Sequence, residues 1–364
     1  MENIALLLVG GFLGSGKTTA IVQAAEQLHA EDIPFGVITN DQGKKQVDSL
    51  FMKGRDIATQ EVSDGCFCCR YRDLEAGLSA IVESIHPKII FAESVGSCAD
   101  LVATVINPLL RFNPGNYRIV LSVFTDIRLL MSSLLGDERL FSGNVHYIFE
   151  KQLEEADIIV INKVDLMGQE QLLSAKKLIS KAFPDKLCLF QNSRSASDIS
   201  EWLTVALQQA STVSTRDSLD IDYDRYGAGE ADLAWLDQEL GIVTRQSDCF
   251  EASWSLMNLI QEKIRYHSLP IGHLKFILDD GIEQFKISFT GTADSTAGLD
   301  FTQRKAHRLV LLINARIQAS PELLQELVSS SILEIEYRLG CQITVRSLSA
   351  FQPGFPRPTH RLTR

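Results

Sequence analysis

The sequence lacks the features that mark membrane, secreted and nucleic-acid-binding proteins. No apolar run approaches the roughly 18 residues needed to span a bilayer, and no basic region precedes the apolar N-terminal stretch, as it would in a signal peptide. The net charge of −11 argues against a protein held to nucleic acid by phosphate contacts. Seven cysteines, an odd number, do not suit a disulfide framework. We therefore expect a cytoplasmic protein with no nucleic acid and no membrane among its partners.

Proline and histidine are also scarce. The 364 residues include 10 prolines and 7 histidines, and the absence of a histidine-rich loop or tail argues against bulk metal storage. The composition, with 45% hydrophobic and 22% charged residues, is typical of a globular protein. A chain of this length is expected to form two domains.

The first half of the chain alternates apolar runs with helical periodicity. We expect strands at residues 4–9, 35–39, 89–92, 117–124, 157–161 and 187–190, and helices at 19–29, 72–85, 98–109 and 168–183. This alternation predicts an α/β domain at residues 1–210, with a mostly parallel sheet covered by helices on both faces.

The pattern changes after residue 210. Residues 211–230 are polar and acidic and are expected to form a linker. Residues 231–350 predict a smaller α+β domain with an antiparallel sheet, because three strands follow one another between helices. The last segment, residues 351–364, contains three prolines and three arginines and is expected to be an extended basic tail.

The N-terminal strand runs into a phosphate-binding motif. Residues 10–19 (GGFLGSGKTT) fit the pattern G-x-x-x-x-G-K-[ST] from Gly11, whose glycines let backbone N–H groups curl around a phosphate. Lys17 would neutralise charge on the β- and γ-phosphates, and the Thr18 hydroxyl would ligate Mg²⁺. The strand, loop and helix occur in the order that a P-loop NTPase requires. The expected nucleotide-binding residues here are Gly11, Gly14, Ser15, Gly16, Lys17, Thr18 and Thr19.

A carboxylate ends the third apolar run. Glu93 follows residues 89–92 and precedes Gly96, an arrangement similar to a Walker B segment, whose acid reaches Mg²⁺ or its water shell. Gly96 would let the backbone approach the γ-phosphate. The competing interpretation is a solvated acid at a strand end.

A second nucleotide-binding motif follows the fifth apolar run, residues 157–161. Residues 162–165 (NKVD) stand directly after an apolar strand. Asp165 could accept hydrogen bonds from N1–H and the 2-amino group of guanine, a donor pair that adenine lacks, while Asn162 contacts the purine edge and Lys163 packs across the base. A simple helix cap is the alternative. Ligands bind at the carboxyl ends of parallel strands, so this position favours guanine specificity.

Three cysteines are crowded together at residues 65–69 (GCFCC). Cys66, Cys68 and Cys69 offer soft thiolate ligands suited to Zn²⁺, Co²⁺ or Cu⁺. The fourth ligand could be water, a histidine, a carboxylate or a client protein. Burial as small apolar side chains and a redox role are the alternatives. The scattered cysteines Cys98, Cys188, Cys249 and Cys341 are expected to be structural.

Together these motifs resemble the CobW-like family of P-loop GTPases, which is related to the GTPases that mature hydrogenase and urease nickel sites. The resemblance is carried by residues 10–19, 65–69, 93–96 (ESVG) and 162–165. It covers about residues 1–200. It implies GTP and GDP as ligands with Mg²⁺, a transferred Zn²⁺ or Co²⁺ ion, a client metalloprotein as partner, and a homodimer as an allowed state.

The resemblance also suggests roles for less distinctive positions. Residues 40–43 (NDQG) are similar to a switch segment, Asp48 corresponds to its later acid, and Ser193 stands where a last guanine-contacting loop falls. Two positions depart from the family: Val95 replaces the usual threonine after the glutamate, and the usual basic-glycine signature of the second domain is not evident.

The resulting hypothesis is a GTP-gated metallochaperone. The expected catalytic residues are Lys17, Thr18, Asp41 and Glu93, with Asp41 orienting water or metal. Intrinsic turnover should be slow, because no arginine finger is identifiable. One alternative is a GTPase switch for assembly of a cofactor-dependent enzyme, with structural or redox-active cysteines. A further alternative is an ATP-dependent kinase.

Overall fold

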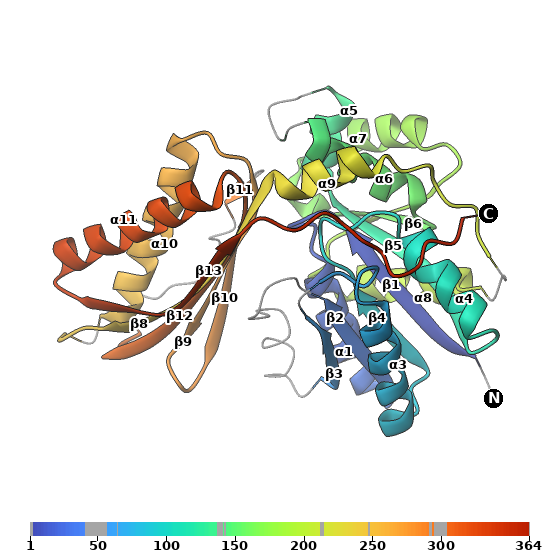
Figure 1. The fold of residues 1–364 in the computed structure, drawn as a ribbon, viewed down its shortest axis with the longest axis horizontal. Coiled ribbons are helices and arrows are strands. Elements are labelled where there is room, and N and C mark those ends of the chain that lie inside the picture. Colours follow the sequence, from blue (N-terminus) through green and yellow to red (C-terminus); the bar gives the residue numbers. More distant parts are fainter. Residues whose placement is uncertain are drawn as a thin grey trace. The chain divides into compact units, whose positions relative to one another are not determined.

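The computed structural model describes residues 3–40, 57–63, 65–136, 141, 143–211, 215–246, 248–290, 293–294 and 304–363. The chain divides into two compact units (Figure 1). The first unit comprises Met1–Gly229 and Phe355–Arg364, and the second comprises Glu230–Gly354. Among the described residues, no helix is both long enough and apolar enough to cross a bilayer.

The first unit is built on a seven-stranded sheet in which neighbouring strands are parallel. The strand order is β3-β2-β4-β1-β5-β6-β7. The strands are β1 (Ile4–Gly11), β2 (Phe35–Asn40), β3 (Thr59–Val62), β4 (Ile89–Glu93), β5 (Tyr117–Asp126), β6 (Ile158–Asn162) and β7 (Leu187–Gln191). β4 and β6 are buried along their whole length, as expected for a sheet covered on both faces.

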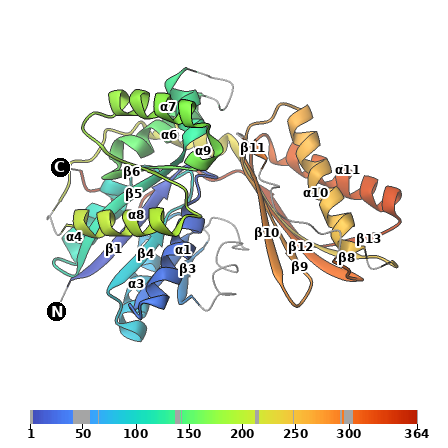
Figure 2. The same ribbon diagram turned by 180° about the vertical axis from the view of Figure 1, so that it is seen from behind.

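Helices connect these strands or follow the last of them. They are α1 (Lys17–Ala30), α3 (Tyr71–Ile85), α4 (Asn107–Phe112), α5 (Ile127–Leu134), α6 (Gly143–Glu155), α7 (Gln169–Ala182), α8 (Ala196–Gln209) and α9 (Tyr223–Ala231). Alternate strand residues such as Leu7 and Val9 share a core with α1 and α8, and Figure 2 shows these two helices lying over the sheet. Trp202 of α8 is fully buried there. On the opposite face, Ile81 of α3 packs against Gly36.

The helix expected at residues 98–109 begins later than the sequence predicts. Asp100 has a φ of +65°, a left-handed conformation that does not propagate a right-handed helix. The segment therefore continues as a π-helical turn, Val102–Ile106, which leads into α4. Residues 94–100 thus remain a loop.

The second unit is an antiparallel six-stranded sheet with two helices. The order is β11-β10-β9-β12-β8-β13. Its elements are β8 (Leu233–Val243), α10 (Cys249–Tyr266), β9 (Ile271–Asp279), β10 (Gln284–Thr290), β11 (Ala293–Asp294), β12 (Arg308–Gln318), α11 (Pro321–Leu339) and β13 (Gln342–Phe351). Leu256 of α10 and Val328 of α11 belong to one core with alternate sheet residues such as Leu240. The predicted fold class, a parallel α/β domain followed by an antiparallel α+β domain, is confirmed.

Parts of the expected linker and tail pack against the first unit. Residues 223–231 form α9, and the hydroxyl of Tyr226 accepts a hydrogen bond from the N–H of Ala99 at 3.2 Å. The backbone N–H of Thr359 donates to the carbonyl of Cys68 at 2.8 Å. The C-terminal segment therefore returns to the unit in which the chain begins.

Candidate nucleotide and metal site

The phosphate loop joins β1 to α1 through glycines in left-handed conformations. Gly11, Gly14 and Gly16 have φ angles of 120°, 73° and 95°, which other residues adopt only with strain. The Lys17 ammonium donates to the carbonyl of Gly11 at 2.7 Å and thereby stays inside the loop. The buried Ser15 hydroxyl has no hydrogen-bond partner among the described residues. A loop that holds the Lys17 ammonium on its inner side and has a free hydroxyl at Ser15 suits a phosphate anion.

The predicted magnesium residues meet beside this loop. The Thr18 hydroxyl donates to Oε1 of Glu93 at 2.9 Å, because β1 and β4 are adjacent and place Val9 opposite Glu93. Both side chains are buried. A hydroxyl and a carboxylate are the hard oxygen ligands that Mg²⁺ uses next to phosphate, so this pair fits the ion.

Gly96 brings the loop after β4 against the phosphate loop. A Cβ added at Gly96 would lie 2.6 Å from a side-chain carbon of Leu13 and 3.0 Å from its backbone N. Only glycine permits this approach. The loop that follows Glu93 is therefore in direct contact with the loop that would carry the nucleotide.

The NKVD segment lies at the carboxyl end of β6. The Asn162 side-chain amide donates to the carbonyl of Ser15 at 2.7 Å and accepts from the N–H of Ser193 at 2.9 Å. Asn162 therefore ties the phosphate loop to the loop after β7. Asp165 is exposed in a 3₁₀ turn, where it is accessible to a base.

Asp126 and Arg128 were missed by the sequence interpretation. Lys163 pairs with Asp126 at 3.0 Å, and Arg128 donates from its Nε to the same carboxylate at 2.9 Å. Burial alone would raise the pKa of Asp126, but the hydrogen bonds from Arg128 and the charge of Lys163 lower it to about 2. The available signal was an aspartate closing the apolar run at residues 117–124, next to the strand that bears NKVD.

The three cysteines form a compact cluster in the turn before α3. The Sγ atoms of Cys66 and Cys68 are 2.7 Å apart, those of Cys68 and Cys69 are 3.7 Å apart, and all three lie within 4.8 Å of one another. Asn40 at the end of β2 holds the turn by donating to the carbonyl of Gly65 at 2.7 Å and accepting from the N–H of Phe67 at 2.9 Å.

Hydrogen bonds within the cluster give the three thiols different pKa values. Hydrogen bonds from Cys68 and Cys69 lower the pKa of the Cys66 thiol well below its usual value. Hydrogen bonding to Cys66 raises the pKa of Cys69 to about 11 and also raises that of Cys68. Cys66 therefore loses its proton more readily than its two neighbours do, and the thiolate is the form that binds soft metal ions.

Two predicted site residues lie outside the described residues: Asp41, expected to orient water or metal, and Asp48, expected to be the later acid of the switch. Ser193 lies at the end of a chain of contacts that runs from the phosphate loop through Asn162.

A parallel sheet with this loop at the end of β1, and a Thr18–Glu93 pair beside it, defines a P-loop nucleotide-binding protein. The family model described as "CobW/HypB/UreG, nucleotide-binding domain" matches residues 5–190, about half of the chain. The chain belongs to this family.

Individual relatives agree with this membership. The chain is 28% identical over 177 residues to "Zinc chaperone YjiA" of Escherichia coli, a match covering 48% of this chain and 53% of the relative. It is 30% identical over 165 residues to "Zinc chaperone YeiR" of the same organism, covering 43% and 46%. The chain thus spans about half the length of the curated relatives it matches.

Among solved structures, HypB from Helicobacter pylori in complex with nickel covers 57% of this chain and 87% of its own, with 17% identity and a TM-score of 0.40. HypB from Archaeoglobus fulgidus covers 56% and 89%, with 19% identity and a TM-score of 0.37.

Proposed function

We propose that this protein is a GTP-binding and GTP-hydrolysing metallochaperone that carries a divalent transition metal on Cys66, Cys68 and Cys69 and delivers it to a client protein. The observation that carries the proposal is the three-thiol cluster in the same compact unit as a phosphate loop of the family. Relatives named zinc chaperones support Zn²⁺ as the cargo, with Co²⁺ as the second candidate.

Nucleotide chemistry is assigned to the residues around β1. Lys17 releases its contact with the carbonyl of Gly11 and neutralises charge on the β- and γ-phosphates. Thr18 and Glu93 would hold Mg²⁺, which supplies charge neutralisation at the phosphates when bound. Asp165 reads the guanine edge, and Asp41 orients the attacking water. We expect slow intrinsic turnover, because no arginine finger is identifiable in the sequence.

Nucleotide state would control metal retention through the elements that both sites share. Asn40 supports the cysteine turn and is the first residue of the NDQG segment assigned as a switch. Order imposed by a γ-phosphate on this segment would hold the turn, and hydrolysis would relax it, as in other order–disorder switches. The metal ion is thus held in one nucleotide state and released in the other.

A chelator-competed zinc titration tests the metal assignment. Wild type is compared with Cys66→Ser, Cys68→Ser and Cys69→Ser, and with Cys188→Ser as the matched control on β7, distant in sequence from the cluster. We expect one tightly bound ion per chain, lost in the three cluster variants and kept in the control. Equal weak binding in all five proteins contradicts the proposal.

A comparison of GTP with ATP as substrates tests the proposed GTPase activity. Steady-state phosphate release is measured with GTP and with ATP for wild type and Lys17→Ala. The proposal expects turnover of GTP alone, abolished in the variant. Preference for ATP would instead support a kinase-like reaction on the same loop.

The short contact between the Cys66 and Cys68 sulfur atoms, 2.7 Å, favours a redox-active pair as the second candidate. In that case the protein would be a GTPase switch for assembly of a cofactor-dependent enzyme. Thiol counting after mild oxidation and after zinc loading separates the two: a redox pair loses two thiols reversibly, and a metal site is protected by zinc.

A further inference from the structure

Residues 355–363, which we name the C-terminal strap, lie against the turn that carries the three clustered cysteines. The backbone N–H of Arg357 donates to Sγ of Cys69 at 3.3 Å, so a main-chain donor contacts one of the proposed metal ligands directly. The N–H of Thr359 donates to the carbonyl of Cys68 at 2.8 Å, and the Thr359 hydroxyl donates to the carbonyl of Cys69 at 3.1 Å. The strap is therefore hydrogen-bonded to two of the three clustered cysteines.

Aromatic contacts hold the strap next to the cysteine turn. The ring centroid of His360 lies 5.0 Å from that of Tyr71, the first residue of α3, and 5.0 Å from that of Phe112, the last residue of α4. Tyr71 is fully buried. The strap thus packs on the helix that the cysteine turn leads into.

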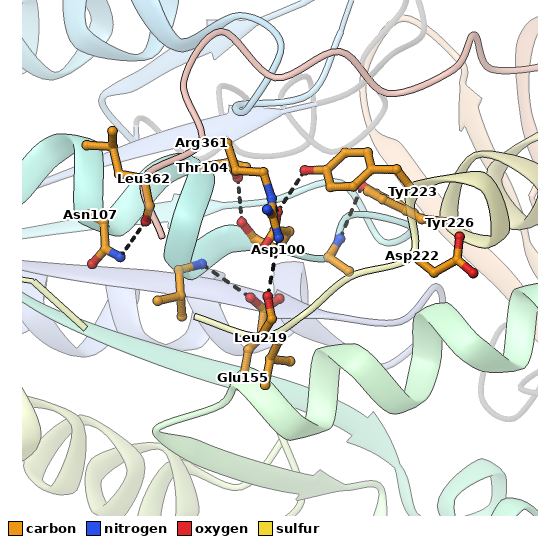
Figure 3. A network of polar contacts seen from close by, with 12 residues as sticks. Asp100, Thr104, Asn107, Glu155, Leu219, Asp222, Tyr223, Tyr226, Arg361 and Leu362 are labelled. Atoms are coloured by element: carbon orange, nitrogen blue, oxygen red, sulfur yellow. Dashed lines mark hydrogen bonds and ion pairs between the residues drawn. The ribbon is translucent and has the colours of Figure 1, made fainter. Parts of the chain in front are cut away.

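The far end of the strap is anchored on Asp100, as Figure 3 shows. The Arg361 guanidinium pairs with the Asp100 carboxylate at 2.7 Å, and the Tyr223 hydroxyl donates to the same carboxylate at 2.7 Å. The N–H of Leu362 donates to the carbonyl of Ala103 at 2.8 Å. Because Asp100 is 1% exposed, losing the ion pair with Arg361 would be costly for this buried carboxylate.

Both connections of the chain to the second unit reach this anchor. α9, which carries Tyr223, leads into Glu230–Gly354, and the strap begins where that stretch ends. A Cβ added at Gly227 of α9 would lie 2.5 Å from Cδ2 of Phe355, so the two connections also touch each other. The strap is therefore bound by the first unit while it continues the chain of the second.

Cys69 is the most accessible of the three clustered thiols. Cys66 and Cys68 are buried, whereas Cys69 is partly exposed. A chelator or a client thiol therefore reaches a bound metal ion most easily beside Cys69, which is also the cysteine that Arg357 and Thr359 contact.

We propose that the strap retains the metal ion, and that Arg357 is a positioning residue whose N–H stabilises the Cys69 thiolate. A hydrogen bond from an N–H to an anionic acceptor is charge-assisted, and groups that hydrogen-bond to metal ligands orient them and tune metal binding. The strap controls the rate of metal release far more than the number of ions bound. This inference rests on the proposed metal-carrying function.

Arg357 allows a matched test of the hydrogen bond. Arg357→Pro removes the N–H, and the position suits proline because a residue that precedes a proline, here Pro358, favours the extended conformation. Arg357→Ala removes the same side chain and keeps the N–H. Zinc release to excess chelator should be about fivefold faster in the proline variant and unchanged in the alanine variant, with one ion bound per chain in both.

A cobalt spectrum distinguishes direct action on the sulfur atom from a general loosening of the turn. A donor to a thiolate lowers the energy of the sulfur electrons, so its loss should move the Co²⁺–thiolate charge-transfer band to longer wavelength. We expect this shift in Arg357→Pro. We expect no shift in Arg357→Ala or in Thr359→Val, which removes a hydroxyl that donates to a carbonyl.

The anchor is tested at a distance from the thiols. Arg361→Gln removes the cation that pairs with Asp100, and zinc release should become at least about fivefold faster because the strap is held less firmly. Arg338→Gln is the control, since Arg338 is an exposed arginine that pairs with Glu334 within α11. GDP affinity verifies that the first unit is folded in each variant.

The outcomes separate this inference from the proposed function. Equal release rates in wild type, Arg357→Pro and Arg361→Gln would overturn the role of the strap and leave the metallochaperone proposal standing. Faster release from Arg357→Pro without a shift of the cobalt band would overturn the assignment of its N–H to the Cys69 thiolate. Failure of the wild type to bind zinc or cobalt would overturn the proposed function itself.

Discussion

Glu155, at the end of α6, is a carboxylate with almost no access to water. It is 7% exposed, and its Oε2 accepts from the N–H of Val102 at 3.2 Å. Burial raises the pKa of Glu155 to about 8. The folded protein therefore keeps this group protonated at neutral pH, where the unfolded chain has released the proton.

Because the pKa of Glu155 is raised in the folded protein, the free energy of unfolding depends on pH. A raised folded-state pKa contributes stability that is complete below the unfolded pKa, near 4.5, and is lost as the pH rises toward 8. From this group we expect the free energy of unfolding to fall by about 3 kcal/mol between pH 5.5 and pH 8. Glu155→Gln should remove that part of the slope, measured by urea unfolding at each pH. Glu83→Gln, an exposed position on α3, is the control, and equal slopes in all three proteins would refute the prediction.

Asp165 carries the proposed base specificity at the residue scale. Asp165→Asn replaces an acceptor pair with an amide that can donate to the 2-carbonyl of xanthine. We expect GTP to bind at least about tenfold more weakly, and xanthosine triphosphate to bind more tightly than in wild type. Competition with a fluorescent guanine nucleotide measures both. If Asp165→Asn keeps the wild-type preference for GTP over xanthosine triphosphate, the purine base does not bind at Asp165.

At the scale of elements, the pairing of β1 with the parallel strand β5 depends on one glycine at the end of β1. A Cβ at Gly11 would lie 2.1 Å from the carbonyl oxygen of Phe124, and the φ of Gly11 is +120°. Gly11→Ala should therefore lower the free energy of unfolding by more than about 3 kcal/mol.

Gly10 is the matched control for this prediction. A Cβ there meets only side-chain carbons, the nearest being Cδ1 of Leu101 at 3.3 Å. Gly10→Ala should change the free energy of unfolding by less than about 1 kcal/mol. Similar losses in the two variants, measured by thermal and urea unfolding, would contradict the steric argument.

The elements themselves were largely predictable from the sequence, because most of the apolar strand runs are buried along all or nearly all of their length. The late start of the helix after Cys98 was not, since it depends on the left-handed Asp100, whose conformation is stabilised by partners from distant segments, Tyr223 and Arg361. Local patterns carry no information on such contacts. For the same reason, the sequence interpretation described residues 351–364 as a plain extended tail, although Thr359 and Arg361 form hydrogen bonds with the first unit.

At the scale of the whole molecule, nucleotide and metal chemistry are assigned to a unit that is discontinuous in sequence. Met1–Gly229 carries the phosphate loop and the three clustered cysteines, and Phe355–Arg364 returns to this unit after the chain has formed the second one. A shortened chain made of residues 1–229 alone would lack the strap. The chain between the two pieces, Glu230–Gly354, has its own core and remains free for client recognition in our proposal.

The central claim is that nucleotide state controls metal affinity. We would measure zinc affinity by chelator competition with Mg²⁺ and a non-hydrolysable GTP analogue, and again with Mg²⁺ and GDP, on wild type and on Thr18→Ala, which lacks the hydroxyl that meets Glu93. The account predicts at least about a tenfold difference between the two nucleotide states in wild type and none in the variant. Equal affinities in both states of the wild type would contradict it.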